Sequence, residues 1–444
     1  MTYQEALDYI HSVSWKGSRP GLERITQLCA RLGNPQDQLK FIHVAGTNGK
    51  GSTCAMLSSI LVAAGYRVGL FTSPYIVHFN ERMKVNGCDI PDDILAEITQ
   101  YVRPHADAMD DAPTEFELIT AIAFEYFRRE ACDVVVLEVG MGGRLDSTNI
   151  ISPETVILSV ITGIAMDHTA FLGDTPEAIA REKAGIIKPH VPVLFGGAHP
   201  AVGGDETTAI DHNRVAGVIA QRAAELNAPY TETCHDSLRD IRCQLEGADF
   251  SFGSRRDLHV SLPGLYQPYN AATVLTAMDL LTARGWQVTD EHIRRGLSQV
   301  YWPGRFEILC RHPLVISDGG HNPEGVDAAV ASIKAFFGDE KVYLLSGVMG
   351  DKDYNPMMRR MAEVSERVFT VKPDNPRALS AAAYAQAFSS LGLPACGYDT
   401  VAEAVSAAMA ACERNNKALL CLGSLYMYGE VKAAVAQYRA HHPI

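Results

Sequence analysis

Short apolar runs alternate with amphipathic stretches along most of the 444 residues. The runs have the length of β-strands, and apolar residues recur at helical spacing in the stretches between them. Such alternation is typical of an α/β fold in which helices connect the strands of a largely parallel sheet. The expected strands cover residues 41–45, 67–71, 133–139, 155–161, 191–195, 314–317, 342–346, 367–371 and 418–422.

The chain is too long for one typical hydrophobic core, and one break divides the alternation. Helical patterns at 270–284 and 289–298 lead into "VYWPGRFEIL", where Pro303 and Gly304 end any helix before a new alternation starts. We therefore expect two domains joined by a hinge, with a ligand cleft between the domains. These parts are an N-terminal P-loop-type domain at 1–298, a hinge at 299–305 and a smaller Rossmann-like domain at 306–444. Residues 230–262 alternate polar and apolar side chains, which predicts an antiparallel flap or edge.

Composition and charge exclude some classes of partner. The net charge of −13 comes without a run of lysines or arginines, so a nucleic-acid partner is not expected. No apolar run approaches the length of a membrane span, and the N-terminus lacks the apolar core of a signal peptide. We expect a cytoplasmic protein with no membrane partner.

The stretch "FIHVAGTNGKGST" joins an apolar strand to a glycine-rich turn with one lysine and then to a helical pattern. A strand, a glycine turn and a helix place backbone N–H groups and the positive helix end around one point, which suits a phosphate. Lys50 would reach the phosphates, and Ser52 or Thr53 could face a magnesium ion. The match to GxxxxGK[ST] is imperfect, because Val44 and Gly51 depart from it. A nucleotide site is favoured over a plain strand-to-helix turn.

Two further segments place oxygen ligands after strands. "VVVLEVGMGGRLDSTN" ends an apolar strand in Glu138, where a carboxylate is a metal ligand or the partner of a structural arginine. "LFTSPYIVHFNERMKVNG" carries Ser73, whose hydroxyl either belongs to a β-turn or faces magnesium.

These motifs resemble the folylpolyglutamate synthase and dihydrofolate synthase family, relatives of the muramyl amino-acid ligases. The shared segments are "HVAGTNGKGST", "TSPYIVHFNERM", "EVGMGGRLDSTN", "DHTAFLGDTPEAIAREKAGIIK", "LPGLYQPYNAATVLTA" and "DGGHNP", and later "SGVMGDKD", "NPRAL" and "GSLYMYGEV" follow in the family's order. Three positions depart from the family pattern: Tyr75 and Tyr266 stand where histidine is usual, and Gly320 replaces alanine. The resemblance covers nearly the whole chain.

The resemblance implies a site between the two domains. The residues implied in ATP binding are Gly46, Thr47, Asn48, Gly49, Lys50, Gly51, Ser52, Thr53, Asn270, Arg305 and Asp318. Two Mg²⁺ sites are implied at Ser73, Glu138, His168 and Lys183, the last of these carbamylated. The implied catalytic residues are Lys50, Lys183, Asp318 and His321. The implied borders of the pterin or folate pocket are Thr114, Phe116, Glu117, Arg144, Leu145, Asp146 and Ser147, and "RPGLERI" at 19–25 could contribute.

Several of these residues also have a structural interpretation. Thr114 and Glu117 form a capping box ahead of a helical pattern, which accounts for both. A lone histidine such as His168 is more often structural than a ligand, and a helical lysine such as Lys183 is usually solvated. Arg305 could simply pair across the domain interface.

The expected function is ATP-dependent ligation of L-glutamate to a pteroate or folate carboxylate through an acyl phosphate. The small-molecule substrates would be ATP, glutamate and either dihydropteroate or a reduced folate, bound by a monomer. Two alternatives remain. One is an amide ligase of the muramyl branch, and the other is a nucleotide-binding regulator without chemistry, which would have lost metal residues.

Overall fold

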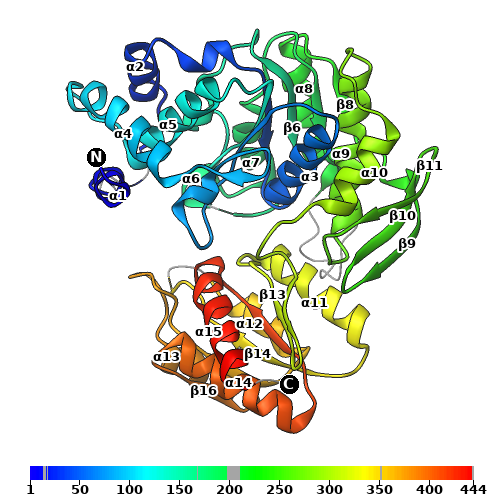
Figure 1. Ribbon diagram of the computed structural model, residues 1–444. Coiled ribbons are helices and arrows are strands. Elements are labelled where there is room, and N and C mark those ends of the chain that lie inside the picture. The colour runs from blue at the N-terminus through cyan, green and yellow to red at the C-terminus, as the bar shows by residue number, and fades with distance from the viewer. Residues whose placement is uncertain (14–16, 18, 168, 198–210, 351–352, 443–444) are drawn as a thin grey trace.

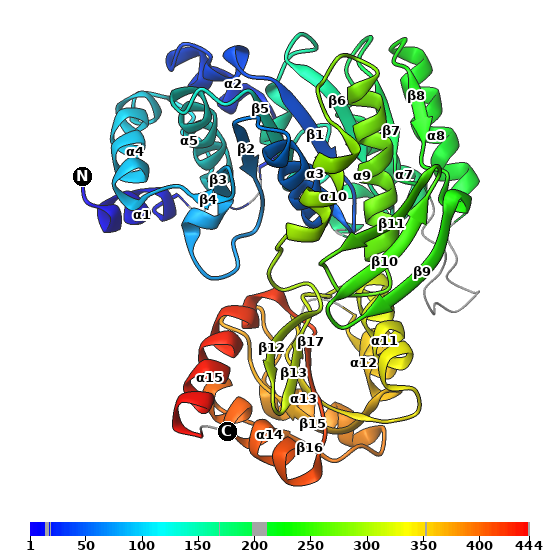
Figure 2. The ribbon, with the colours of Figure 1, turned by 45° about the vertical axis from the view of Figure 1, so that its right-hand side comes forward.

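The computed structural model describes residues 1–13, 17, 19–167, 169–197, 211–350 and 353–442. Two α/β bodies lie one above the other, each built around its own sheet (Figure 1). A small three-stranded sheet lies beside the larger body near the junction (Figure 2). The expected α/β architecture with two sheets is confirmed.

The larger sheet has eight strands in the order β4-β3-β2-β5-β1-β6-β7-β8. The pairs from β2 to β8 are parallel, whereas β3 and β4 add antiparallel strands at one edge. The strand bounds are β1 Phe41–Ala45, β2 Val68–Phe71, β3 Met83–Val85, β4 Cys88–Asp89, β5 Val134–Glu138, β6 Val156–Ile161, β7 Val193–Phe195 and β8 Tyr230–Glu232. The central position of β1 puts the loop that follows it in the middle of the carboxyl edge of the sheet.

Helices cover both faces of this sheet. Successive side chains of a strand point to opposite faces, so Ile42 and Val44 join the core under α3, α9 and α10, whereas Phe41 joins the core under α2, α4 and α5. The helix bounds are α1 Tyr3–His11, α2 Glu23–Arg31, α3 Lys50–Ala63, α4 Asp92–Asp107, α5 Glu115–Arg129, α6 Thr169–Leu172, α7 Pro176–Ala184, α8 His212–Glu225, α9 Gln267–Thr282 and α10 Asp290–Gln299. The central parallel strands β1, β2 and β5 are buried along their whole length and therefore consist mostly of apolar residues.

The alternating stretch 230–262 forms two different structures. β9 (Leu238–Gln244), β10 (Gly247–Phe252) and β11 (Arg255–Val260) make the expected antiparallel sheet, and Ala248 and Phe250 of β10 are buried in the core beside α9. β8 instead pairs parallel to β7 at the edge of the large sheet. The three residues of β8 are half-buried or exposed, so the sequence pattern does not distinguish this edge strand from a flap.

The C-terminal sheet has the order β12-β13-β17-β14-β15-β16, parallel except for β12. Its strands are β12 Glu307–Arg311, β13 Leu314–Ser317, β14 Val342–Ser346, β15 Ser365–Thr370, β16 Ala395–Gly397 and β17 Leu419–Leu422. Its helices are α11 Pro323–Phe337, α12 Asn355–Ala362, α13 Ala381–Ser390, α14 Val401–Asn415 and α15 Tyr428–His441. Separate cores fill its two faces.

The connection between the bodies, residues 300–306, contains neither helix nor strand. It ends at Phe306, which is fully buried and has a positive φ of 50°. The division at 1–298, 299–305 and 306–444 stays a prediction. Within the described part of the chain, every helix is too short or too polar to cross a membrane.

Candidate active site

The loop between β1 and α3, residues 46–49, presents backbone N–H groups at the start of a helix. α3 begins at Lys50 without a side-chain cap, and the Thr53 N–H bonds the Gly49 carbonyl. The amides of residues 49–52 precede the first intrahelical donor and are the donors left over at a helix N-terminus, whereas the Thr47 N–H already bonds the Gly163 carbonyl. These amides and the helix dipole suit an anion such as a phosphate group.

Two glycines of this loop have no room for a side chain. At Gly46, where φ is 152°, a Cβ would lie 1.7 Å from the Thr162 hydroxyl oxygen. At Gly49, where φ is 82°, a Cβ would lie 2.6 Å from Asn270 Oδ1. Asn270 of α9 therefore packs directly against the loop, where its expected role in nucleotide binding requires it to be.

The segment after β6 holds the loop in place. Thr47 Oγ1 donates to the Ala165 carbonyl at 3.1 Å and accepts from the Ala165 N–H at 3.0 Å. Thr162 donates to the Asn48 carbonyl at 2.7 Å. A loop fixed by these bonds needs little reorganisation to receive phosphates.

The first turn of α3 is packed from the hinge side and from α9. A Cβ on Gly51 would lie 2.8 Å from the indole nitrogen of Trp302. The Ser52 hydroxyl accepts a bond from the Gln267 amide at 3.2 Å. Thr53 is fully buried, and its hydroxyl has no hydrogen-bond partner in the part of the chain that the structure describes. Of the two candidate hydroxyls, Ser52 is tied to α9 and Thr53 fills the interior behind the loop.

Two lysines meet on the loop. Lys50 Nζ donates to the carbonyls of Gly46 at 3.0 Å and Thr47 at 3.1 Å. Lys183, near the end of α7, is buried and donates to the Gly46 carbonyl at 2.7 Å. Burial and the neighbouring charge of Lys50 lower the pKa of Lys183 to about 7. The structure therefore excludes the solvated lysine that the helical pattern alone would suggest.

Glu138 ends β5 beside the loop. Its carboxylate accepts the Ser73 N–H at 3.2 Å, so β2 and β5, which are paired parallel strands, bring these two metal candidates together. Burial raises the pKa of Glu138, while Lys50, the Ser73 amide and Arg305 act in the opposite direction. No structural arginine pairs with Glu138 among the described residues, so an ionised Glu138 is free to bind a cation.

The donors around Glu138 fit Mg²⁺. The described residues contain no group of three or more His, Cys, Asp or Glu side chains that could hold a metal. Mg²⁺ is typically bound by one or two carboxylates together with water and substrate phosphates. Glu138 supplies one carboxylate and Ser73 a neighbouring hydroxyl, so these residues fit such an ion. His168, the expected ligand of a second ion, lies outside the described residues.

Asp318 joins the two bodies. It follows β13 and is buried. Its Oδ2 accepts hydrogen bonds from the Tyr266 hydroxyl at 2.9 Å and from the Phe306 N–H at 2.8 Å. Its Oδ1 accepts a hydrogen bond from the Gly320 N–H at 2.7 Å. Burial and the nearby Asp318 raise the pKa of Tyr266. The tyrosine that departs from the family pattern thus forms a hydrogen bond between the domains.

Other residues of the C-terminal domain also face the loop. Asn322, the N-cap of α11, donates to Asn48 Oδ1 at 3.0 Å, and Asn48 also donates to Glu324. His321 Nδ1 lies 2.8 Å from the Gly319 carbonyl, and a Cβ on Gly319 would lie 3.1 Å from Arg305. The sequence did not reveal the roles of Asn322 and Tyr266, because their partners are far away in the chain.

Thr114 and Glu117 bind each other through Glu117 Oε2, whereas Glu117 Oε1 is buried and has no hydrogen-bond partner among the described residues. Thr114 is the N-cap of α5, and its N–H and hydroxyl both donate to Glu117 Oε2, at 2.7 and 2.9 Å. The same oxygen accepts Arg24 Nε at 3.0 Å in a buried ion pair. Arg24 belongs to the "RPGLERI" segment, so this segment supports α5. Phe116 instead lies against Phe71 and beside Gly140, near the carboxyl ends of β2 and β5.

The "GGRLDSTN" turn is likewise held by its own residues. Asp146 accepts bonds from Met141 N at 2.9 Å and from Thr148 N at 3.0 Å, and it caps the short 3-10 helix Ser147–Ile150. Arg144 is exposed and pairs with Glu182 at 3.0 Å, and Leu145 is half-buried. Asp146 fixes the shape of the turn, and the contact of this turn with a pterin stays a prediction.

Comparison with known proteins agrees with this geometry. The model of the Mur ligase middle domain matches residues 44–278, and that of the Mur ligase glutamate ligase domain matches residues 304–425. A dihydrofolate synthase/folylpolyglutamate synthase of Bacillus subtilis is 39% identical over 388 residues, covering 85% of this chain and 86% of the relative. A folylpolyglutamate synthase of Lacticaseibacillus casei is 38% identical over 396 residues, covering 86% and 89%. A solved structure of Escherichia coli FolC in complex with DHPP and ADP has a TM-score of 0.83 and 32% identity, covering 99% of both chains.

A phosphate loop facing a second α/β domain, in a chain matched by both Mur ligase models, defines an ATP-dependent ligase of the Mur class. Within that class, the chain belongs to the folylpolyglutamate synthase and dihydrofolate synthase family. The resemblance read from the motifs is confirmed, and the folate branch is favoured over the muramyl branch and over a regulator without chemistry.

Proposed function

We propose that the protein joins the amino group of L-glutamate to the carboxylate of dihydropteroate or of a reduced folate, using ATP. The observation that carries the proposal is the cluster formed by the phosphate loop, Glu138 and the low-pKa Lys183 at the edge facing Asp318. We also place the reaction in the cytoplasm, with residues 299–305 as the hinge of a monomer.

In the first step, an oxygen of the substrate carboxylate attacks the γ-phosphorus of ATP and ADP leaves, giving an acyl phosphate. The amides at the start of α3 hold the phosphates, and Lys50 exchanges the Gly46 and Thr47 carbonyls for phosphate oxygens. Ser73, Glu138 and a carbamylated Lys183 would hold Mg²⁺, with His168 as a further ligand. The ion would neutralise charge on the transferred phosphoryl group.

In the second step, the glutamate amine attacks the acyl carbon, inorganic phosphate leaves and an amide forms. The chain needs no serine or cysteine nucleophile for this. Asn48 contacts Asn322 and Glu324 across the junction, and Asp318 binds Tyr266, so domain closure sets the distance between the loop and the C-terminal residues. Water must be excluded at this stage, because it would hydrolyse the acyl phosphate.

The test is magnesium-dependent ADP release from the purified protein with glutamate and either dihydropteroate or tetrahydrofolate. Release with dihydropteroate supports dihydrofolate synthase activity, release with tetrahydrofolate supports chain extension, and release with both supports a bifunctional enzyme. Omission of glutamate is the control. Absence of ADP release with both acids, in protein that still binds ATP, contradicts the proposal.

Tyr266→Phe removes one hydroxyl from the contact between the domains. A hydrogen bond to a charged group contributes about 1.5–3 kcal/mol, so we expect kcat/KM for ATP to fall roughly 10- to 100-fold. Tyr266→His, which keeps a donor, is expected to retain more activity. Steady-state kinetics measures both.

The matched control is Tyr428→Phe, which removes a hydroxyl that donates to Glu307 within the C-terminal domain. This variant is expected to keep kcat/KM within a few fold. Equal kinetic losses in Tyr266→Phe and Tyr428→Phe would contradict an inter-domain role for Tyr266.

A further inference from the structure

Arg82 is a charged side chain that the proposed mechanism does not use. It ends the 3-10 helix Phe79–Arg82, within the segment that also carries Ser73. Its guanidinium lies over the ring of Tyr75, 5.1 Å from the centroid, and 5.8 Å from that of Phe79. Among the described residues, its buried Nε has no hydrogen-bond partner and no carboxylate forms an ion pair with its guanidinium.

Its neighbour Glu81 has a complete structural explanation. The Glu81 carboxylate accepts the N–H groups of Ile76 at 2.9 Å, Val77 at 3.2 Å and His78 at 3.1 Å. These bonds shape the loop between Ser73 and Phe79. Arg82 adds no comparable bond to that loop, so the fold accounts for Glu81 and leaves the guanidinium of Arg82 available.

Two carboxylates that act electrostatically on Arg82, Glu115 and Glu138, form no ion pair with it among the described residues. Burial lowers the pKa of Arg82, while Glu115, Tyr75, Tyr426 and Glu138 act in the opposite direction. Glu115 pairs with His11 at 2.9 Å, and Glu138 accepts the Ser73 amide. A largely buried cation without a bonded anion is costly unless a ligand supplies the anion.

The position of Arg82 indicates what that ligand is. Tyr75, on which the guanidinium lies, is 36% exposed, and Tyr426 of the C-terminal domain is 52% exposed. Glu138 of the active site and Tyr426 both act electrostatically on Arg82 and favour its charged form, so the guanidinium lies within electrostatic reach of both. Under the proposed function, the substrates that reach this junction carry carboxylates, and a planar guanidinium binds a carboxylate through two parallel hydrogen bonds.

We propose that Arg82, held by Tyr75 and Phe79, binds a non-reacting substrate carboxylate. This inference rests on the proposed function and adds one residue that determines substrate affinity. Two sources share the same chemistry: the glutamyl chain of a folate and the incoming glutamate. Dihydropteroate lacks a glutamyl chain, so the two acid substrates separate these sources.

The test compares Arg82→Gln and Arg82→Lys with wild type, by the KM values of dihydropteroate, tetrahydrofolate, glutamate and ATP. Loss of hydrogen bonds to a charged group is expected to raise the affected KM roughly 10- to 100-fold in Arg82→Gln, and less in Arg82→Lys. A rise for tetrahydrofolate but not dihydropteroate assigns the folate chain, and a rise for glutamate with either acid assigns the incoming amino acid. The KM of ATP is expected to stay unchanged.

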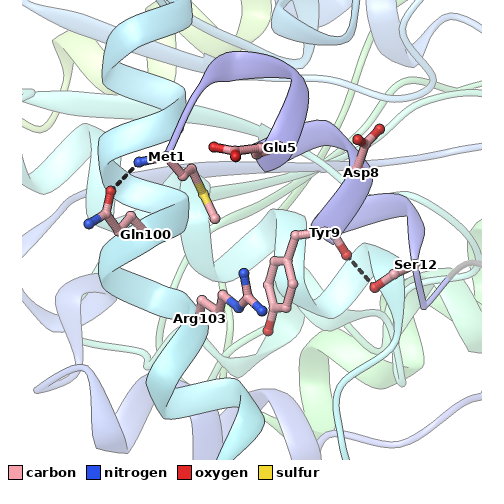
Figure 3. Close-up of a pocket in the computed structure, with 7 residues that line it drawn as sticks. All are labelled: Met1, Glu5, Asp8, Tyr9, Ser12, Gln100 and Arg103. Atoms are coloured by element: carbon pink, nitrogen blue, oxygen red, sulfur yellow. Dashed lines mark hydrogen bonds between the residues drawn. The ribbon is translucent and has the colours of Figure 1, made fainter.

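Arg103→Gln is the matched control. The Arg103 guanidinium lies 4.8 Å from the centroid of the Tyr9 ring, in a surface hollow lined by residues of α1 and α4 (Figure 3). It pairs with Asp107, so its stacking resembles that of Arg82 without an unpaired charge. Its removal is expected to leave all four KM values unchanged.

Unchanged KM values in Arg82→Gln, or an equal rise in all four with a lower melting temperature, would overturn the inference and leave Arg82 as a brace of the loop. If the wild-type protein releases no ADP with either acid, the proposed function itself is rejected. Wild-type activity combined with a neutral Arg82→Gln variant rejects only the role of Arg82.

Discussion

Replacing Glu138 with glutamine is expected to lower kcat by about 10²–10³-fold, the size of effect produced by removing one preorganised electrostatic contact. The substitution keeps the shape of the side chain and an oxygen that can accept the Ser73 amide. It removes the negative charge that would bind Mg²⁺ beside the phosphates. Magnesium-dependent ADP release at saturating substrates measures the loss.

The same substitution is expected to leave stability unchanged or to increase it. Burial raises the pKa of Glu138, so ionising it in the folded protein costs more than in the unfolded chain. That cost is present above the folded pKa, and the neutral glutamine avoids it. Urea unfolding near pH 8 is therefore expected to give the variant an equal or higher free energy of unfolding.

Glu125→Gln is a control for which the opposite result is expected. Glu125 is 1% exposed and pairs with Arg128 at 2.8 Å and Arg129 at 2.7 Å, on a helix that does not reach the phosphate loop. Its replacement is expected to lower stability without lowering kcat. If Glu138→Gln lowered both kcat and the free energy of unfolding, Glu138 would be a structural residue and the metal assignment would fail.

The sequence predicted the strands that are buried on both faces. The ranges 41–45, 314–317 and 342–346 match β1, β13 and β14 at both ends, because an apolar run bounded by polar residues marks where a strand enters and leaves the core. It missed β12 and β16, whose residues are half-buried or exposed at a sheet edge and so form no apolar run. It also missed β3 and β4, which have three and two residues and are too short to give a pattern, although Met83 and Val85 of β3 are buried. Burial on both faces and strand length together decided which strands the sequence revealed.

The candidate site was predictable where its chemistry is local. The loop 46–49, Glu138 and Lys183 each stand in a compact motif, and the structure brings all three together. The bonds of Asp318 to Tyr266 and of Asn322 to Asn48 join residues far apart in the chain, so no local pattern contains them. The Arg24–Glu117 pair is similar: a capping box was visible in the sequence, but its buried arginine was not.

Lys183→Ala is expected to lower kcat by on the order of 10²–10³-fold, and added acetate or propionate is expected to restore part of it. With a pKa of about 7, the buried amine is largely neutral above that pH. A neutral amine attacks CO₂ and loses a proton to form a carbamate, whose oxygens can bind Mg²⁺. In the alanine variant, a small carboxylate can occupy the space left by the side chain and supply similar oxygens.

Two comparisons separate a carbamate from a simple cation at this position. Lys188 is also largely buried, has its pKa lowered to about 8 by burial, and donates to the Asn149 carbonyl at 2.9 Å, away from the loop. Lys188→Ala is expected to show no response to acetate. Wild-type activity is expected to fall below pH about 7, where the ammonium form cannot react, and to rise with added bicarbonate. Two results would contradict a carbamate: neither acetate nor propionate restores the activity of Lys183→Ala, and bicarbonate does not change the activity of the wild type. Lys183 would then act only through its bond to Gly46.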